Sequence, residues 1–145
     1  VAAWRVNNKT IAFSNGCFDI LHEGHIFSLN QAASEADILI IGVNSDLSVK
    51  RLKGPERPIN NEISRSIMLS NLAVVDAVVV FEEDTPLTLI QSLMPDVIVK
   101  GGDYTIDQIV GSKEVIANGG RVVINPIVEG FSTTGIIAQI KKSYS

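Results

Sequence analysis

Short apolar runs alternate along the chain with longer segments in which apolar residues recur every three or four positions. The short runs have the length of strands and fall at residues 10–14, 37–44, 77–81, 97–99 and 121–125. The longer segments have helical spacing and fall near residues 25–36, 62–72, 86–94, 112–118 and 135–142. This alternation predicts an α/β fold: a doubly wound, Rossmann-like parallel sheet of five strands, with right-handed crossovers and helices on both faces.

The helix predicted at residues 62–72 carries Ile63, Ile67, Met68 and Leu72 at helical spacing. Arg65 then projects from the first turn on a different face of this helix.

Polar and glycine-rich segments follow the predicted strands at residues 15–25, 44–57, 100–104 and 129–134. In an open parallel sheet, ligands bind beyond the carboxyl ends of the strands, near the point where the strand order reverses. We therefore expect these four segments to meet at one rim and to form a single site.

The chain has 145 residues, which is the length of one domain, and residues 1–9 form a lead-in segment with a helical turn anchored by Trp4. The hydrophobic fraction of 46% fits strands that are buried on both faces. The apolar runs are too short to cross a membrane, and the single cysteine cannot form an internal disulfide. With no leader-like N-terminus, these features predict a cytoplasmic protein. The net charge of −4 argues against a nucleic-acid-binding protein.

Residues 15–25 carry two histidines, His22 and His25, where the first strand hands over to a helix. A helix N-terminus offers free backbone N–H groups and a positive dipole end to an anion. Gly16 and Gly24 lack β-carbons, which predicts close approach of a phosphate to the main chain. The alternative is that the histidines only cap the helix or lie on the surface. Their spacing of three does not match the helical zinc motif, so we predict no metal site on the protein.

Four of the 12 basic residues, Lys50, Arg51, Lys53 and Arg57, fall within residues 50–57. Glycine and proline in this segment predict a loop, which is either a phosphate clamp or a solvated run of charge. Residues 132–134, Ser-Thr-Thr, form a capping cluster before the last predicted helix, whatever the function.

Residues 15–25, Asn-Gly-Cys-Phe-Asp-Ile-Leu-His-Glu-Gly-His, resemble the HxGH signature of the nucleotidyltransferase superfamily, and residues 132–134 resemble its second signature. Within that superfamily the chain is most similar to the adenylyltransferase domain of ADP-heptose synthases. The segments that carry this likeness are 44–46, 50–54, 57–58, 81–86, 99–104 and 111–115, and the whole likeness covers residues 10–142. Two departures are Glu23, whose side chain we expect to point away from the phosphates, and Phe131, which replaces a smaller residue before Ser132.

The resemblance implies transfer of AMP from ATP to D-glycero-D-manno-heptose 1-phosphate, giving ADP-heptose and pyrophosphate for lipopolysaccharide biosynthesis. It implies catalytic roles for His22, His25 and Lys53. It implies nucleotide binding by Cys17, Phe18, Gly24, His25, Lys100, Gly101, Asp103, Ser132, Thr133 and Thr134. It implies binding of the second substrate by Asn15, Asp19, Asn44, Lys50, Arg57 and Arg65.

Some of these residues have competing roles. Asp19 is expected to orient a histidine or hold the loop rather than bind metal, Cys17 to pack rather than act as a nucleophile, and Arg65 to pair with a neighbouring carboxylate. Mg²⁺ is the expected cofactor, bound mainly through ATP phosphates. The expected partners are ATP and a sugar 1-phosphate, with a separate heptose kinase acting alongside, and homo-oligomer formation stays open.

Two other functions remain alternatives. One is a sister nucleotidyltransferase, of the glycerol 3-phosphate cytidylyltransferase or phosphopantetheine adenylyltransferase type. The other is a non-catalytic nucleotide-binding domain.

Overall fold

The computed structural model describes residues 1–102, 104–127 and 129–144. Its centre is a sheet of five parallel strands in the order β3-β2-β1-β4-β5. The strands are β1 (Ile11–Gly16), β2 (Ile38–Asn44), β3 (Ala77–Phe81), β4 (Val97–Gly101) and β5 (Arg121–Asn125). The predicted fold class and all five strand positions are confirmed, with boundaries shifted by one or two residues.

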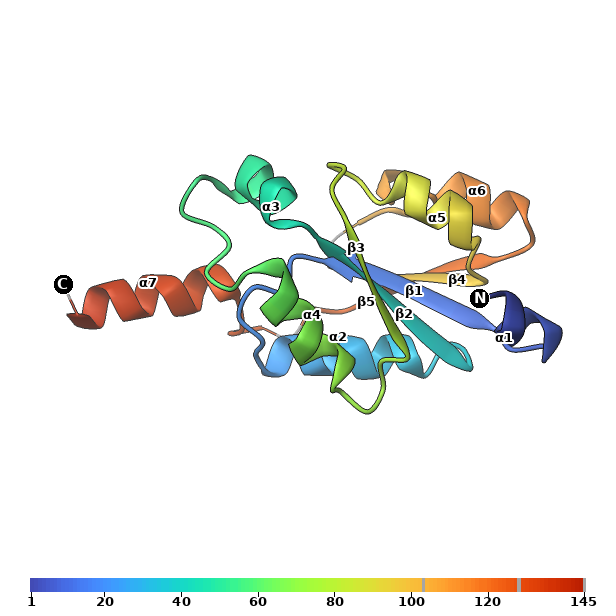
Figure 1. The fold of residues 1–145 in the computed structure, drawn as a ribbon, viewed down its shortest axis with the longest axis horizontal. Coiled ribbons are helices and arrows are strands. Elements are labelled where there is room, and N and C mark those ends of the chain that lie inside the picture. The colour runs from blue at the N-terminus through green and yellow to red at the C-terminus, as the bar shows by residue number, and fades with distance from the viewer. Residues whose placement is uncertain (103, 128, 145) are drawn as a thin grey trace.

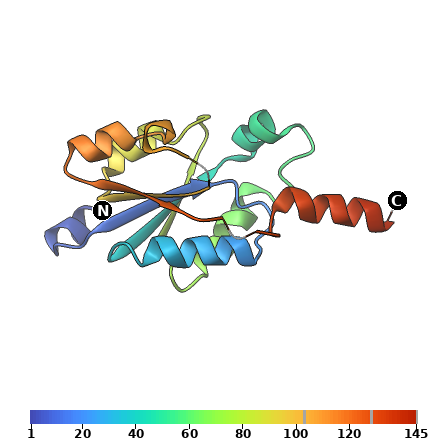
Figure 2. The ribbon, with the colours of Figure 1, turned by 180° about the vertical axis from the view of Figure 1, so that it is seen from behind.

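Helices cover both faces of this sheet (Figure 1). In sequence order they are α1 (Ala2–Val6), α2 (Glu23–Ala33), α3 (Asp46–Lys53), α4 (Glu62–Ser70), α5 (Leu87–Leu93), α6 (Ser112–Ala117) and α7 (Thr133–Tyr144), with a 3₁₀ turn at Ile106–Gln108. Helices α2 and α4 lie on one face and α5 and α6 on the other, and the view from behind agrees (Figure 2). No helix within residues 1–102, 104–127 and 129–144 is long and apolar enough to cross a membrane.

The sheet separates two hydrophobic clusters, because alternate residues of each strand face opposite sides. Ala12 packs with Leu29 and Leu69, on the side of α2 and α4. Its neighbours Ile11 and Phe13 pack with Ile90 and Val115, on the side of α5 and α6. Full burial of each large apolar side chain stabilises the fold by about 1.5–3 kcal/mol. The central strands β1, β2 and β4 are therefore largely buried on both faces, as the composition predicted, whereas the edge strands β3 and β5 are only partly buried.

The N-terminal segment is tied to the sheet. Trp4 packs against the cluster that contains Phe13. The Arg5 guanidinium pairs with Asp96 at 2.5 Å and donates to the carbonyl of Met94 at 2.7 Å. Asp96 also accepts from the backbone N–H of Ile11 at 2.8 Å. The expected helical turn with Trp4 as its anchor is confirmed, and it holds the start of β1.

The prediction that residues 50–57 form a loop is wrong for its first half. Helix α3 runs through Lys53, and the loop begins only at Gly54. The Ser45 side chain accepts from the backbone N–H of Ser48 at 3.1 Å and so starts the helix. Gly54, with a φ of 108°, ends it. The basic residues of the last turn face the negative end of the helix dipole, which favours helix over loop.

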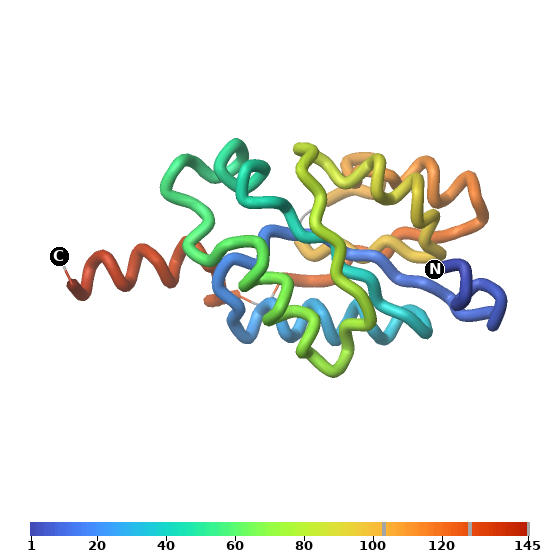
Figure 3. Tube along the Cα trace, viewed as in Figure 1, coloured from blue at the N-terminus to red at the C-terminus, as the bar shows by residue number. Residues whose placement is uncertain are grey.

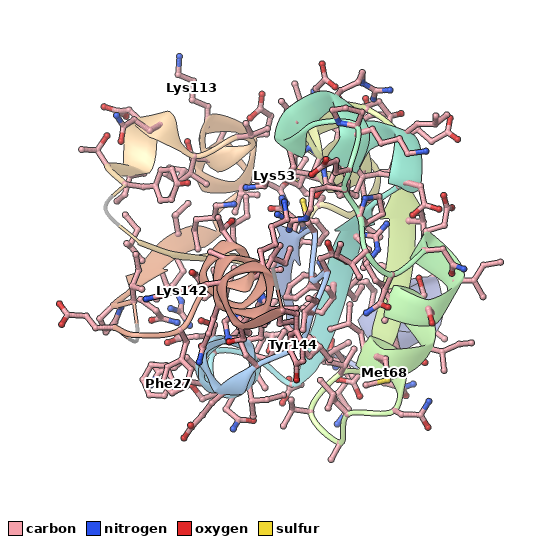
Figure 4. All side chains as sticks on the ribbon, turned by 90° about the vertical axis from the view of Figure 1, so that its left-hand side faces the viewer. Phe27, Lys53, Met68, Lys113, Lys142 and Tyr144 are labelled. Carbon is pink, nitrogen blue, oxygen red and sulfur yellow. The ribbon has the colours of Figure 1, made fainter. Side chains whose placement is uncertain are left out.

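Helix α4 forms where predicted, and Arg65 does lie on a different face from the apolar residues. That face is the buried one: Arg65 is 1% exposed and Leu69 is fully buried. Ile63, Ile67 and Met68 are more than half exposed, and Figure 4 labels Met68 on α4. Helical spacing therefore located the helix without identifying its inner side.

The carboxyl ends of the strands point toward the side of the molecule from which α7 projects (Figure 3). The loops that follow the strands meet at this rim. The strand order reverses between β1 and β4, so the loop after β1, with both histidines, occupies the centre.

Candidate active site

A cleft of about 780 Å³ opens at the carboxyl ends of the strands. All four segments that the sequence analysis expected to converge contribute to it. The predicted site residues that line it are Asn15, Cys17, Phe18, Asp19, His22, His25, Asn44, Lys53, Arg57, Lys100, Gly101, Ser132, Thr133 and Thr134. The convergence on one rim is therefore confirmed.

The two histidines form a stacked pair at the start of α2. Their ring centroids lie 3.8 Å apart, with 25° between the planes. The backbone N–H of His22 donates to Nδ1 of His25 at 3.2 Å. Since Nδ1 accepts, neutral His25 carries its proton on Nε2. His25 can therefore donate this proton to an oxygen anion in the cleft.

Burial, together with the neighbouring His22, lowers the pKa of His25 to about 4. Burial also lowers the pKa of His22 below its ordinary value. Both rings are therefore neutral hydrogen-bonding groups near neutral pH. The Nδ1 atom of His22 is buried and has no hydrogen-bond partner among the described residues.

Two phenylalanines flank the histidine pair. The ring centroid of Phe18 lies 5.4 Å from that of His25, and the ring of Phe131 stacks on His22 at 6.2 Å. A β-carbon at Gly16 would meet the Phe18 ring at 3.1 Å, and one at Gly24 would meet the His22 ring and Phe131 at 3.0 Å. The two glycines therefore make room for these side chains. The approach of a phosphate to the main chain beside them stays a prediction.

Asp19 holds the loop between α3 and α4. Its carboxylate is buried and accepts from Nε of Arg57 at 2.8 Å and from the backbone N–H groups of Ile59 and Asn60 at 2.9 Å. Burial alone would raise the pKa of this carboxyl, but these donors outweigh burial and lower it. Asp19 was expected to orient a histidine or to hold the loop, and its contacts are those of a residue that holds the loop.

Arg65 lies beneath the cleft, outside its lining. Its Nη1 donates to the carbonyls of Cys17 and Asn44 at 2.7 Å, and its Nε to that of Asn60 at 2.9 Å. Nη2 pairs with Asp46 at 2.8 Å, which confirms the expected carboxylate partner. One buried guanidinium thus fixes the ends of β1 and β2 and the loop before α4. The structure does not bring Arg65 into position for direct contact with a substrate.

The cations of the cleft come from separate elements. Lys53 is the last residue of α3, and Figure 4 shows it near the centre of the rim, above α7. Lys100 lies within β4, with its Nζ 5.6 Å from the Tyr104 ring centroid, and burial lowers the pKa of its ammonium. Lys50 is exposed and is not among the residues that line the cleft, so the structure does not bring it together with the other predicted site residues.

Burial raises the pKa of the Cys17 thiol, although Lys53, Arg65 and Arg57 oppose this effect. A raised pKa favours the protonated thiol near neutral pH, which does not suit a nucleophile.

Residues 132–134 begin α7 and close the other side of the cleft. Oγ of Ser132 accepts from the backbone N–H of Gly135 at 2.9 Å, and the Thr133 hydroxyl donates to the carbonyl of Ile20 at 3.3 Å. The cluster thus has its capping role and also ties α7 to the histidine loop. All three residues line the cleft together with His22 and His25, and a helix N-terminus of this kind stabilises an anion.

Several lining residues were given no role from the sequence: Leu52, Asp84, Thr85, Pro86, Tyr104, Val110, Ile127 and Phe131. Asp84, Thr85 and Pro86 belong to a segment that contributed to the family resemblance, which was the available signal. Gly24 borders a smaller adjoining pocket, whereas the exposed Glu23 lines neither this pocket nor the cleft. Asp103 lies outside the described residues.

No group of three or more His, Cys, Asp or Glu side chains within the part of the chain that the structure describes is placed to hold a metal ion. Asp19, the buried carboxylate of the cleft, is already engaged by Arg57 and two backbone N–H groups. A metal at this site would therefore need ligands from a bound substrate.

Comparison with known proteins gives one consistent family. The cytidylyltransferase-like family model matches residues 13–139. The chain is 56% identical over 141 residues to the bifunctional protein HldE of Mesorhizobium japonicum, and 54% identical over 140 residues to that of Rhodospirillum rubrum. These matches cover 97% of this chain and 28% of each relative, so the chain spans less than a third of the length of these curated relatives.

Two solved structures have a similar fold. The lipopolysaccharide core biosynthesis protein of Thermoplasma volcanium superposes with a TM-score of 0.67 and 32% identity, covering 83% of this chain and 97% of that chain. Pantoate-beta-alanine ligase of Francisella tularensis superposes with a TM-score of 0.57 at 15% identity, covering 92% of this chain and 70% of that chain. The second likeness concerns the fold alone.

Proposed function

Because the chain belongs to the cytidylyltransferase-like family, we propose that it transfers AMP from ATP to D-glycero-D-manno-heptose 1-phosphate, releasing pyrophosphate and ADP-heptose. The observation that carries the proposal is the stacked pair of neutral histidines at the start of α2, facing a cleft that also contains Lys53 and Arg57. Such a set of donors and cations suits a polyphosphate and a second anionic substrate.

The choice of heptose rests on the sequence resemblance and on the relatives. The relatives named HldE are bifunctional, and this chain matches 28% of the length of two of them. The similar structure from Thermoplasma volcanium is named for lipopolysaccharide core biosynthesis. Both names agree with a domain that adenylylates a heptose phosphate, with the kinase step performed by another domain or protein.

In the proposed reaction, a phosphate oxygen of the sugar phosphate attacks the α-phosphorus of ATP. A new P–O bond forms, and the P–O bond to pyrophosphate breaks. The attacking oxygen is already an anion, so no protein nucleophile or general base is required. The protein aligns two substrates that repel one another and stabilises the charge that moves to the leaving group.

The side chains divide this work by position. Nε2–H of His25 donates to the α-phosphate, while His22 and Lys53 contact the triphosphate. The residues that begin α7 offer hydroxyls and N–H groups to the terminal phosphates. Asp19 holds Arg57 in place through its Nε alone. The other N–H groups of the guanidinium remain available to donate to a substrate phosphate.

We propose that Mg²⁺ binds here mainly through nucleotide oxygens, because this ion keeps several of its own waters and usually binds with substrate phosphates. When bound, it would offset the negative charge of the triphosphate.

The test is a pyrophosphate-release assay with Mg²⁺, pairing ATP, CTP, GTP and UTP with heptose 1-phosphate and glycerol 3-phosphate. We expect ATP with heptose 1-phosphate to give the highest kcat/KM. If CTP with glycerol 3-phosphate is fastest, the chain is a sister cytidylyltransferase. If no pair releases pyrophosphate although ATP binds, it is a non-catalytic nucleotide-binding domain.

A further inference from the structure

The loop between β3 and α5 faces the cleft without an assigned task. Asp84, Thr85 and Pro86 of this loop line the cleft, and the first two are exposed. The Thr85 hydroxyl has no hydrogen-bond partner among the described residues. A carboxylate beside a site for two phosphates is unfavourable for those phosphates. Asp84 therefore suits a neutral, hydroxylated part of a substrate.

Arg51 fixes the position of Asp84. Nε of Arg51 donates to Oδ1 of Asp84 at 2.8 Å, and a second nitrogen of the guanidinium donates to the carbonyl of Glu82. Oδ2 of Asp84 has no partner within the part of the chain that the structure describes. The ion pair thus holds the carboxylate in one orientation and leaves one oxygen to accept from a ligand.

The strand order places these groups in one half of the cleft. Strands β1, β2 and β3 are consecutive neighbours, and Asn44 pairs in register with Phe81, three residues before Asp84. Asn44 is 4% exposed yet lines the cleft, and its Nδ2 donates to Ser48 at 3.0 Å. Its Oδ1 has no partner among the described residues. The other half, beyond β4 and β5, holds Lys100 and Phe131.

We propose that Asp84 and Thr85, together with Asn44, form the subsite that binds the sugar hydroxyls of the acceptor, with Arg51 as a positioning residue. This inference rests on the proposed function. The nucleoside then occupies the half beside β4 and β5, and the reacting phosphates meet between the two halves, over the histidines. A carboxylate oxygen accepts hydrogen bonds from hydroxyls strongly, and it rejects a ligand that cannot supply them.

The substitutions that test the subsite are mild for the fold. The Arg51 and Asp84 side chains are 49% and 65% exposed, and exposed ion pairs contribute little to stability. We expect Asp84→Ala to raise the KM for the sugar phosphate by about 10- to 100-fold, the effect of one charge-assisted hydrogen bond. The KM for ATP should change less than about twofold, since the nucleoside lies in the other half.

Glu83→Gln is the matched control. It removes one negative charge from the same loop, at an exposed residue that does not line the cleft, and it should leave both KM values unchanged. Asp84→Asn keeps one acceptor oxygen and should lie between the wild type and Asp84→Ala. Arg51→Met keeps the Asp84 side chain but removes the ion pair that orients it. This variant should raise the KM for the sugar phosphate less than Asp84→Ala does.

Deoxy analogues of the sugar phosphate separate recognition from a structural role. The wild type should reject the analogue that lacks the contacted hydroxyl by about 10-fold or more, and Asp84→Ala should lose this discrimination. If the wild type turns over the sugar phosphate and Asp84→Ala keeps both its KM and its discrimination, the subsite is overturned and the proposed function stands. If the wild type turns over no sugar phosphate, the proposed function is overturned, and the subsite with it.

Discussion

His25 shows how one side chain is prepared for a phosphate by its own backbone. Its Nδ1 is occupied by the N–H of His22, so the Nε2 proton is directed away from that contact. The stacked ring of His22 fixes its plane. This donor is therefore held in place before a substrate binds, which is the condition under which one hydrogen bond contributes most to a rate.

His25→Ala should lower kcat about 10²- to 10³-fold, because it removes one preorganised donor, and unfolding should remain cooperative. The measurement is steady-state kinetics with a urea unfolding curve. Glu23→Gln, which changes an exposed neighbour that does not line the cleft, should keep near wild-type turnover. A well-folded His25→Ala variant with near-normal kcat would remove His25 from the mechanism.

The pKa of His25, about 4, also makes stability depend on pH. An unfolded histidine has a pKa near 6.5, so between about pH 6.5 and 4 the unfolded state binds more protons than the folded state. The contribution of His25 to the free energy of unfolding should therefore be complete above about pH 6.5. It should be lost progressively as the pH drops toward 4. Urea midpoints at pH 7 and pH 4.5 measure this loss.

His25→Phe should make this pH dependence shallower, because only His22, whose pKa is also lowered, then contributes in that window. Asp19 acts at lower pH, since its pKa is below the ordinary carboxyl value, and it does not interfere. An equally steep dependence in His25→Phe would contradict the buried, neutral state of this ring.

Among the secondary-structure elements, α4 positions the rim through its inward face. Arg65 replaces the apolar residue that such a face normally carries, and its guanidinium satisfies three carbonyls and one carboxylate. A buried charge is tolerated only when its partners surround it in this way. The helix therefore connects the core of the sheet to three separate segments of the site.

Arg65→Met should destabilise the fold by about 3–5 kcal/mol, since it leaves the partners of the guanidinium unpaired beneath the cleft. Chemical denaturation measures this cost. Arg121→Met, which breaks the exposed ion pair with Glu35, is the matched control and should cost below about 1 kcal/mol. Comparable losses in the two variants would mean that the contacts of Arg65 contribute no more than a surface pair.

Helix α3 ends at the cleft with Lys53. The segment that follows, residues 54–58, is the one that we expect to close over bound ATP. Lys53→Ala should weaken ATP binding and lower kcat, because Lys53 lines the cleft, whereas Lys50→Ala should have little effect since Lys50 lies outside it. ATP with Mg²⁺ should protect residues 54–58 from limited proteolysis in the wild type and less so in Lys53→Ala. If Lys53→Ala and Lys50→Ala change ATP binding and kcat equally, Lys53 has no specific role in the cleft and both lysines contribute only surface charge.

For the molecule as a whole, the sequence predicted what depends on local pattern. Apolar runs of strand length located all five strands, and the parallel topology then required the loops after the strands to share one rim. What depends on contacts between distant segments could not be predicted. One example is the inward face of α4, which Arg65 determines by donating to the carbonyls of residues 17, 44 and 60. Another is the set of side chains around Gly24. The segment 81–86 carried a family likeness but no visible chemistry until the fold placed it at the cleft.

Because loops after all five strands line one cleft, a ligand that contacts several of them should stabilise the entire domain. ATP with Mg²⁺ at 100 times its Kd adds about 2.7 kcal/mol, which for a domain of this size raises the Tm on the order of 10 °C. The proposed function places adenine near Lys100 and Gly101, so CTP at the same concentration should raise the Tm less, because its base does not match polar groups that read adenine. Thermal denaturation with each nucleotide measures the difference. Equal shifts for ATP, CTP, GTP and UTP would show that the cleft binds only the phosphates, and nucleotide choice would then have to arise in the transition state.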